Sequence, residues 1–467
     1  MRIKFNLLAA LIAFGSISAQ TADIGNIYEA AVENDPILGA AVAGYRAQKQ
    51  IVPQARAGLL PSASIGGSST WTERSFPVGP QLDPGTGLLF EIPDDEFNEH
   101  AWRAQVRQPI FNLESWFNYS SAKASREGAK HNLSAAKLAL IVRVSEAYLN
   151  VLRAQDLLES TQASEAAVKR QLDQVQQRFD VGLVAITDVL EAQAAYDNAL
   201  VNLIQADGDQ GIFFQNLTTL TNESYDSLDR LSDQLPIINP DPTNEETWVS
   251  TALSNNLQVL AATEQLLSAR RTLKARRSVF LPKIDATASH SHFVTGGQSF
   301  LGGKIDDNVY GLEISMPIFQ GGFNYSRSKE ARALVDQAQE QLRGQQLTVS
   351  RDARNLYRAV ATDVIRVKAR NRAIKSSESA LDATETGYEV GTRNIVDVLQ
   401  AQQRLFSSQF DYADSRYKYV LDLLRLKQTV GTLTGDDLIE LNNYMDSNNP
   451  VEIITSLRNY GGNLSGQ

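Results

Sequence analysis

Two stretches of the sequence carry nearly the same phrase: RFDVGLVAITDVL at 178–190 and GYEVGTRNIVDVL at 387–399. The shared Val-Gly pair and the shared Asp-Val-Leu triplet recur at one spacing, 209 residues, which is the distance from Gly182 to Gly391. A glycine between two runs of helix-forming residues is typical of a turn. We therefore expect a break between a long helix and a shorter one in each copy.

The repetition extends along most of the chain. QPIF at 108–111 returns as MPIF at 316–319, and ENDPIL at 33–38 aligns with SNNLQV at 254–259. This pattern predicts a tandem structural repeat. The predicted organisation is a first repeat at 20–230, a proline-containing linker at 231–242, a second repeat at 243–435 and a polar C-terminal tail at 436–467. Each repeat is expected to begin with a helix, at 23–58 and 243–279, and the Pro/Gly-rich stretch at 76–93 is expected to form a loop.

The first residues, MRIKFNLLAALIAFGSISAQ, combine a short basic start, an apolar run and small residues. This is the pattern of a secretory signal peptide, which we assign to residues 1–19. No later stretch holds eighteen consecutive apolar residues, so the sequence predicts no transmembrane helix in the exported chain.

Composition excludes several classes of function. The net charge of −10 disfavours a nucleic-acid partner. The absence of cysteine excludes disulfides, thiolate metal sites and cysteine nucleophiles. No catalytic or nucleotide-binding motif is present, so we expect no enzyme activity and no cofactor. His290 and His292 share a strand face but have no evident third ligand, so we predict no metal site.

Two very long helices set the scale of the fold. Residues 112–180 and 320–389 contain no proline and are rich in strong helix formers. At about 1.5 Å per residue, each would span roughly 100 Å. A compact domain does not hold a helix of this length, so the sequence predicts an elongated, mainly α-helical assembly with a small β part.

Alternation of apolar and polar residues predicts four strands, near 62–75, 98–111, 283–295 and 306–319. Alternating strands of about ten residues are typical of a membrane β-barrel, although hairpins of a soluble β-sandwich give a similar pattern. Four strands cannot close a barrel in lipid, so the membrane interpretation requires several chains. Three chains would supply twelve strands.

The two phrases, together with PIFQGG at 317–322, resemble the TolC outer-membrane channel family, also known as outer-membrane efflux proteins or outer membrane factors. The resemblance covers nearly all of the exported chain. It implies a homotrimer with a twelve-stranded barrel in the outer-membrane lipid and a long tunnel of helices in the periplasm. The far end of the tunnel would be closed by helical hairpins with bends near 181–188 and 388–397. The implied function is the exit channel of multidrug efflux pumps and type I secretion systems.

The resemblance also implies partners and a gate. The partners are a periplasmic adaptor (membrane fusion) protein and an inner-membrane transporter of the RND, ABC or MFS type. In the family, a tyrosine and an arginine of the second hairpin link to a threonine and an aspartate of the first. The matching residues are Tyr388, Arg393, Thr187 and Asp188. For Asp188 and Arg393 the alternative is ordinary solvated charge on a helix.

Family members also carry two aspartates that line the pore constriction. Asp397 matches the first of these positions, whereas the second is Gln400 in this chain. A ring of carboxylates favours cations, and losing half of the ring weakens binding of multivalent cations. The alternative for Asp397 is a charge at a helix N-terminus. The competing interpretation of the whole chain is a soluble periplasmic coiled-coil adaptor or a structural protein.

Overall fold

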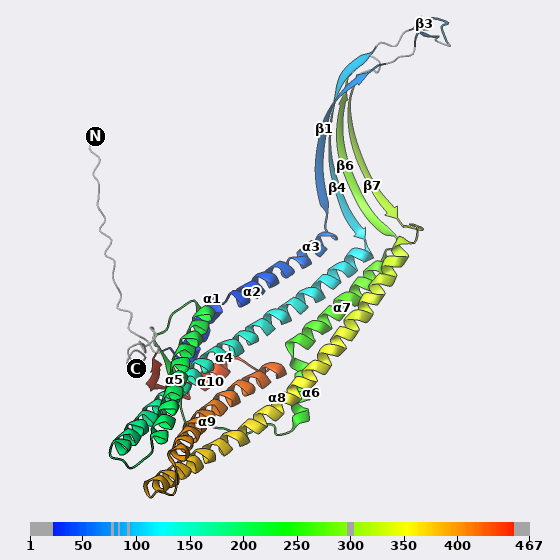
Figure 1. Cartoon of the computed structure of the whole chain (residues 1–467). Coiled ribbons are helices and arrows are strands. Elements are labelled where there is room, and N and C mark those ends of the chain that lie inside the picture. The colour runs from blue at the N-terminus through cyan, green and yellow to red at the C-terminus, as the bar shows by residue number, and fades with distance from the viewer. Residues whose placement is uncertain (1–21, 76–78, 83–84, 91–93, 297–302, 453–467) are drawn as a thin grey trace, which may run out of the picture. The chain divides into compact units, whose positions relative to one another are not determined.

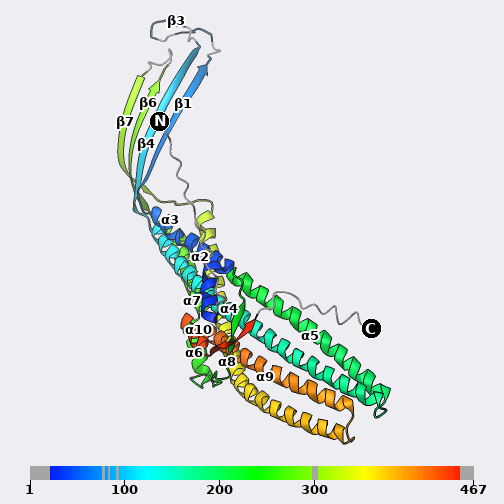
Figure 2. The same cartoon turned by 90° about the vertical axis from the view of Figure 1, so that its left-hand side faces the viewer.

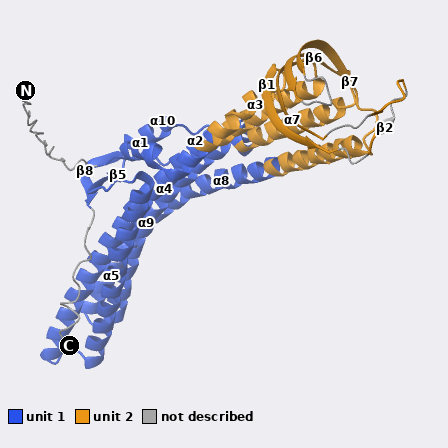
Figure 3. Cartoon of the chain, turned by 90° about the horizontal axis from the view of Figure 1, so that it is seen from above, with its two compact units in different colours: residues 1–42, 133–257, 346–467 blue, residues 43–132, 258–345 orange. Residues whose placement is uncertain are grey.

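The computed structural model describes residues 22–75, 79–82, 85–90, 94–296 and 303–452, shown in Figure 1. The predicted signal peptide at 1–19 lies outside the described residues. The chain divides into two compact units, which are coloured separately in Figure 3. Unit 1 comprises 1–42, 133–257 and 346–467, and unit 2 comprises 43–132 and 258–345.

Unit 2 contains a four-stranded antiparallel sheet in the order β1-β4-β6-β7. Its strands are β1 (Ser62–Arg74), β4 (Asp95–Phe111), β6 (Lys283–Thr295) and β7 (Gly303–Ser315). These four strands were predicted, with boundaries that differ by up to four residues. The predicted loop at 76–93 also holds two short paired strands, β2 (Gln81–Leu82) and β3 (Leu89–Phe90).

The register gives the sheet one apolar and one polar face. Residues directly opposite each other in an antiparallel pair project to the same face. The apolar face includes Ala63, Ile65, Ala104, Val106, Ala286, Ala288, Leu312 and Ile314. The polar face includes Ser62, Ser64, Gln105, Arg107, Thr287, Asp285, Glu313 and Ser315. The predicted alternation is therefore confirmed, up to a bulge in β4 between Pro109 and Phe111.

The helical part of unit 2 packs closely because small residues line the contact. Gly128 of α4 (Leu113–Asp180) faces α7 (Leu257–Ser278), where an added Cβ would lie 3.4 Å from the Ala261 carbonyl oxygen. The Ser121 hydroxyl lies 2.9 Å from both the Ser268 and the Thr272 hydroxyls. The glycine that interrupts the helix-forming run at 112–180 thus permits close packing and leaves α4 unbroken.

Unit 1 contains two helical hairpins, seen side by side in Figure 2. The first joins α4 to α5 (Ile186–Thr221), and the second joins α8 (Phe323–Glu389) to α9 (Ile395–Val430). The start of α9 follows the start of α5 by 209 residues, the same spacing as the two sequence phrases. Both α4 and α5 contact α9, and Arg153 of α4 forms an ion pair with Asp414 of α9 at 2.5 Å.

The helix predicted at 23–58 is divided into α1 (Ile24–Asn34), α2 (Pro36–Lys49) and α3 (Ile51–Ala57). Asp35 ends α1 in an extended conformation and precedes Pro36, which disfavours helix at the preceding residue. The helix predicted at 243–279 is likewise divided, at Asn256, into α6 (Glu245–Asn255) and α7.

The described part of the predicted polar tail, up to residue 452, forms regular secondary structure. It contains α10 (Gly435–Asn442) and β8 (Met445–Glu452), and β8 pairs with β5 (Ser227–Leu231). The first helical turn of α10 is capped by Thr434 and Asp437. This small sheet lies in unit 1, and its strand β5 begins at the end of the first predicted repeat.

Among the described residues, no helix is long and apolar enough to cross a membrane. Within the same residues, no cluster of three or more His, Asp or Glu side chains has the arrangement of a metal site. His290 and His292 instead contact β7, where their Nδ1 atoms lie 2.9 Å from Asn308 Oδ1 and 2.5 Å from Asp306 Oδ1.

Candidate functional site at the two hairpin turns

The first turn lies between α4 and α5 and depends on Gly182. This residue has φ 77°, a left-handed conformation that glycine adopts without steric cost. The Gly182 N–H donates to the Phe179 carbonyl at 2.8 Å, and the Leu183 N–H donates to the Arg178 carbonyl at 2.8 Å. This is the pattern of a Schellman motif, which satisfies the last carbonyls of a helix.

The second turn repeats the same geometry 209 residues later. Gly391 also has φ 77°. Its N–H donates to the Tyr388 carbonyl at 3.1 Å, and the Thr392 N–H donates to the Gly387 carbonyl at 2.8 Å. The repeated Val-Gly pair therefore encodes two Schellman turns of the same form, one between α4 and α5 and the other between α8 and α9.

The two turns meet in one apolar cluster. Val175 of α4, Val189 of α5 and Ile395 of α9 are buried at its centre. Side chains of both hairpins pack around them: Leu172, Phe179, Val184, Tyr388, Val396 and Leu399. We call this set the tip cluster. It holds together the ends of hairpins that lie about two hundred residues apart in sequence.

Tyr388 occupies the boundary between the two hairpins. Its ring packs on the tip cluster, and the Arg178 guanidinium lies 4.9 Å from the ring centroid. The Tyr388 hydroxyl is buried and has no hydrogen-bond partner among the described residues. A buried hydroxyl without a partner is costly, so this group needs an acceptor that the single described chain does not provide.

The other three predicted gate residues are exposed or half-buried, and within the chain they pair locally. The Thr187 hydroxyl lies 3.5 Å from Asp188 Oδ1, which belongs to the adjacent residue. Arg393 Nη1 lies 3.9 Å from Asp397 Oδ2, one helical turn along α9. Tyr388 of the second hairpin thus contacts the first hairpin. Within one chain, however, Arg393 pairs with Asp397 and not with the predicted Asp188.

Asp397 caps the N-terminus of α9, which was the alternative to its predicted role in the pore constriction. Its Oδ2 accepts from the Asn394 N–H at 3.3 Å, and the Asn394 side chain accepts from the Asp397 N–H at 2.9 Å. These reciprocal bonds form a capping box, which stabilises the first turn of α9. The carboxylate is therefore fixed at a helix N-terminus, where the helix dipole also favours negative charge.

Asp397 and Gln400 line one surface depression of about 410 Å³ on the second hairpin, together with Arg393 and Arg404. Arg404, which lies one turn after Gln400, was not among the residues predicted for this site. Neither was Gly387, where an added Cβ would lie 2.8 Å from Arg393 Cγ. Glycine at 387 therefore allows the Arg393 side chain to fold against the end of α8.

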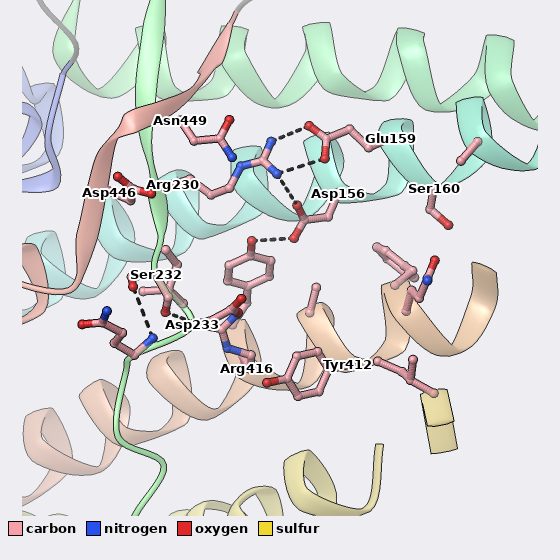
Figure 4. Close-up of a pocket in the computed structure, with 18 residues that line it drawn as sticks. Asp156, Glu159, Ser160, Arg230, Ser232, Asp233, Tyr412, Arg416, Asp446 and Asn449 are labelled. Carbon is pink, nitrogen blue, oxygen red and sulfur yellow. Dashed lines mark hydrogen bonds and ion pairs between the residues drawn. The ribbon is translucent and has the colours of Figure 1, made fainter. Parts of the chain in front are cut away.

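A larger pocket of about 690 Å³ lies farther from the turns, between α4, α9 and the small β5–β8 sheet (Figure 4). Arg230 of β5 pairs with Glu159 of α4 and lies 3.8 Å from Asp156 Oδ1. The Tyr417 hydroxyl of α9 donates to Asp156 Oδ2 at 2.6 Å. The network therefore ties α9 to α4 at the root of the hairpins.

Burial controls the ionisation of this network. Desolvation raises the pKa of Asp156 above its ordinary range, although the Tyr417 hydroxyl and the Arg230 charge oppose the rise. Burial also raises the pKa of Tyr417 well above 10.0. Tyr417 is therefore neutral at physiological pH and acts as the donor to Asp156.

Comparison with known proteins agrees with this architecture. A family model described as outer membrane efflux protein matches residues 27–223 and 248–432. Outer membrane protein TolC of Escherichia coli (strain K12) is 32% identical over 460 residues, covering 95% of this chain and 90% of that protein. The alkaline protease secretion protein AprF of Pseudomonas aeruginosa is 24% identical over 416 residues, covering 88% and 85% of the two chains.

Solved structures show the same fold at lower identity. The outer membrane protein VceC of Vibrio cholerae superposes with a TM-score of 0.74 at 18% identity, covering 87% of this chain and 96% of that one. The MtrE outer membrane channel of Neisseria gonorrhoeae, solved in its open state, gives a TM-score of 0.68 at 17% identity, covering 92% and 98%. The extent of the family match, together with the 32% identity to a TolC protein, establishes that this chain belongs to the outer membrane efflux protein family.

Proposed function

We propose that this chain is an outer-membrane exit channel for efflux and type I secretion, closed at the end where its two hairpin turns meet. The observation that carries the proposal is the tip cluster, in which residues of both turns share one buried apolar core. A closure built from two hairpins can open when one hairpin moves away from the other. Membership of the outer membrane efflux protein family supports this assignment.

We further propose that the working unit is a homotrimer. In the described sheet, β1 and β7 are edge strands, and the apolar face carries exposed side chains such as Ile65 and Leu312. An open edge and an exposed apolar face both call for additional strands and an apolar environment. Three copies would join their sheets into one twelve-stranded barrel in the outer-membrane lipid, and the repeated hairpins would form the helical tunnel.

The proposed gate uses Thr187 and Asp188 as acceptors, and Tyr388 and Arg393 as donors. The unpaired Tyr388 hydroxyl supports this role, because it needs an acceptor beyond those in the described chain. Arg393 is 61% exposed at its side chain, and its 3.9 Å contact with Asp397 is long for an ion pair, so it is free to pair elsewhere. We place the pairing of Arg393 with Asp188 between adjacent copies in the assembly.

The proposed constriction is a ring of three Asp397 carboxylates with Gln400 beside each. Asp397 lies near Arg393 and shares a depression with Arg404, and both positive charges weaken its attraction for cations. Since the second aspartate of the family pattern is Gln400, the ring carries three carboxylates instead of six. The channel should therefore favour cations moderately and bind multivalent cations weakly.

The proposed partners are a periplasmic adaptor protein and an inner-membrane transporter of the RND, ABC or MFS type. Two similar proteins support a role in both secretion and efflux, because their names describe secretion and metal resistance. They are the alkaline protease secretion protein AprF and the cobalt-zinc-cadmium resistance protein CzcC of Cupriavidus metallidurans. The channel itself has no catalytic step in this proposal, so transport energy comes from the inner-membrane partner.

Reconstitution tests this function directly. Purified protein added to a planar lipid bilayer should give discrete conductance steps, and in cells the protein should fractionate with the outer membrane. A soluble periplasmic adaptor would instead appear in the osmotic-shock fluid and would leave the bilayer silent. That pair of results would refute the channel assignment.

A further inference from the structure

The depression that Asp397 and Gln400 line on the second hairpin has an excess of positive charge. Two guanidinium groups line it, those of Arg393 and Arg404, and Asp397 is the only acidic residue in its described lining. The Asp397 carboxylate is already engaged, because its Oδ2 accepts from the Asn394 N–H at 3.3 Å and lies 3.9 Å from Arg393 Nη1. The charge of Arg404 is therefore not balanced within the depression.

Arg404 differs from the other cationic side chains of α9. The others each form an ion pair: Arg416 with Asp233, Lys418 with Asp422, Arg425 with Glu146 and Lys427 with Asp437. Arg404 is exposed, and in the described part of the chain its guanidinium makes no ion pair and no hydrogen bond. A guanidinium has N–H donors and no acceptor, so Arg404 offers its donors to an anion from outside the chain.

No carboxylate lies within one helical turn of Arg404 on α9. The residues three or four positions away are uncharged: Gln400, Ala401, Ser407 and Ser408. Asp397 is seven positions away, or about 10 Å along the helix axis. The α8 residues that line the depression are also uncharged: Ser376, Ser377, Ala380 and Thr384. An anion that binds at Arg404 therefore meets no negative charge at close range.

Gln400 keeps Arg404 available. An aspartate at position 400 would lie one turn before Arg404, where oppositely charged side chains four residues apart pair with each other. Glutamine has nearly the same reach but no charge, so it leaves the guanidinium unpaired. Gln400 is itself exposed, and its side chain has no hydrogen-bond partner among the described residues. Its amide group can therefore donate to the same ligand as Arg404.

The depression has the size and the polar wall that a small organic ligand requires. Its volume of about 410 Å³ lies within the range of ligand pockets, roughly 300–1,000 Å³. On its α8 wall, the Thr384 hydroxyl donates to the Ala380 carbonyl at 2.7 Å, and the Ser377 hydroxyl lies 3.1 Å from that of Ser408. These hydroxyl oxygens can still accept hydrogen bonds, so they suit a ligand that carries hydroxyl groups beside its anionic group.

We propose that this depression binds a small organic oxoanion, a carboxylate or phosphate, through the Arg404 guanidinium and the Gln400 amide. The planar guanidinium matches the oxygens of both groups, and such charge-assisted hydrogen bonds are roughly twice as strong as neutral ones. Arg393 lines the same depression and adds a second positive charge. The inference concerns the second hairpin of one chain and holds whether or not the chain assembles into a gated channel.

Direct binding of citrate, a hydroxylated tricarboxylate, tests the proposal. Equilibrium dialysis of radiolabelled citrate against the full-length protein, solubilised in an uncharged detergent at low ionic strength, should show one bound citrate per chain. Raising the salt concentration should weaken this binding, because salt screens exposed charges. If no citrate is retained, or if its retention does not depend on salt, the proposal is wrong.

Arg404→Gln removes the main donor and should weaken citrate binding by about tenfold, as expected when hydrogen bonds to a charged group are lost. Arg404→Lys keeps the charge without the planar fork, so its affinity should lie between those of wild type and Arg404→Gln. Lys375→Gln is the matched control, because Lys375 is an exposed cation of α8 that does not line the depression. Equal losses in Arg404→Gln and Lys375→Gln would reduce the binding to general attraction by positive charge and overturn the site.

Gln400→Asp separates the charge of Arg404 from its availability. This variant keeps Arg404 but gives it a carboxylate partner within the chain, so citrate binding should weaken about as much as in Arg404→Gln. Gln400→Asn keeps a neutral amide and should change the affinity much less. Both positions are exposed, so these variants should unfold at the wild-type temperature. An unchanged citrate affinity in Gln400→Asp would show that the anion does not bind at Arg404.

Discussion

The Tyr388 ring of the second hairpin lies beneath the Arg178 guanidinium of the first, with 4.9 Å between the guanidinium carbon and the ring centroid. This contact joins the end of α4 to the end of α8 and borders the tip cluster. A cation over an aromatic ring is worth about 0.5–1 kcal/mol at a partly exposed site. The contact therefore belongs to the interactions that keep the two turns together.

Removing this cation should loosen the closed end. Arg178→Gln should shift the closed-to-open equilibrium by about two- to fivefold toward open, the equivalent of 0.5–1 kcal/mol. Open probability in planar-bilayer recordings measures the shift. Arg178→Lys keeps a cation, so its open probability should lie between those of wild type and Arg178→Gln. Arg372→Gln, which removes an exposed charge from α8, should behave as wild type. Equal effects of the two glutamine variants would show that the cation–ring contact has no special role.

The second turn should depend on glycine for its backbone conformation alone. Gly391 has φ 77°, and no atom lies within 4 Å of an added Cβ, so Gly391→Ala introduces strain without a clash. This substitution should lower the free energy of unfolding by about 1–2 kcal/mol. In contrast, Gly344→Ala in the interior of α8 should raise the free energy of unfolding by about 0.5–1 kcal/mol, because alanine loses less backbone entropy on folding. Thermal unfolding midpoints should therefore move in opposite directions, and a common direction would refute this account of the turn.

Gln400 should determine how strongly the channel binds multivalent cations. Gln400→Asp restores the second carboxylate of the family pattern and, in a trimer, raises the ring from three to six charges. Block by a trivalent cation should then tighten by at least tenfold, as measured by current inhibition at a fixed voltage. Gln400→Asn is the neutral control. If block is unchanged in Gln400→Asp, position 400 does not face the ion path.

Asp397 should affect both selectivity and the start of α9. Asp397→Ala removes the charge of the proposed ring and the capping box, whereas Asp397→Asn removes the charge and keeps an acceptor for the Asn394 N–H. Both variants should lower cation preference in reversal-potential measurements, but only Asp397→Ala should also cost about 1 kcal/mol of stability. Unchanged selectivity in both variants would assign the preference to other acidic residues.

The Tyr417–Asp156 hydrogen bond should stabilise the root of the hairpins. Tyr417→Phe leaves the buried Asp156 without its donor and should lower the free energy of unfolding by about 1.5–3 kcal/mol, the range for hydrogen bonds to charged groups. Because Tyr417 lowers the raised pKa of Asp156, the loss should be larger at pH 8 than at pH 5. Tyr412→Phe, on the same helix and beside Arg416, is the control. A loss that does not vary with pH would contradict the assigned charge state of Asp156.

Much of the fold was predictable because periodicity and glycine placement are local signals. The four strands, the two long helices and the turns at Gly182 and Gly391 all follow from such patterns, and membership of the efflux protein family is confirmed by the comparisons. The helix break at Asp35 is also a local signal, because Pro36 follows it. It was not predicted, because helix-forming residues on both sides suggested one continuous helix.

Features that depend on distant contacts were not predictable. The strand β8 has a polar sequence and exists because it pairs with β5, more than two hundred residues earlier. Asp397 was ambiguous because one carboxylate can cap a helix and also face a pore, and only its bonds with Asn394 reveal the first role. The partner of Arg393 depends on side-chain geometry and on neighbouring copies, so its pairing with Asp188 stays a prediction.

The most direct test of the central claim, that the two turns close the channel, is the single-channel conductance of the Tyr388→Phe/Arg393→Ala double variant. We predict a several-fold higher conductance than wild type at the same voltage and salt, because both proposed donors to the first turn are removed. Conductance equal to wild type, in a double variant that assembles and inserts normally, would contradict the claim.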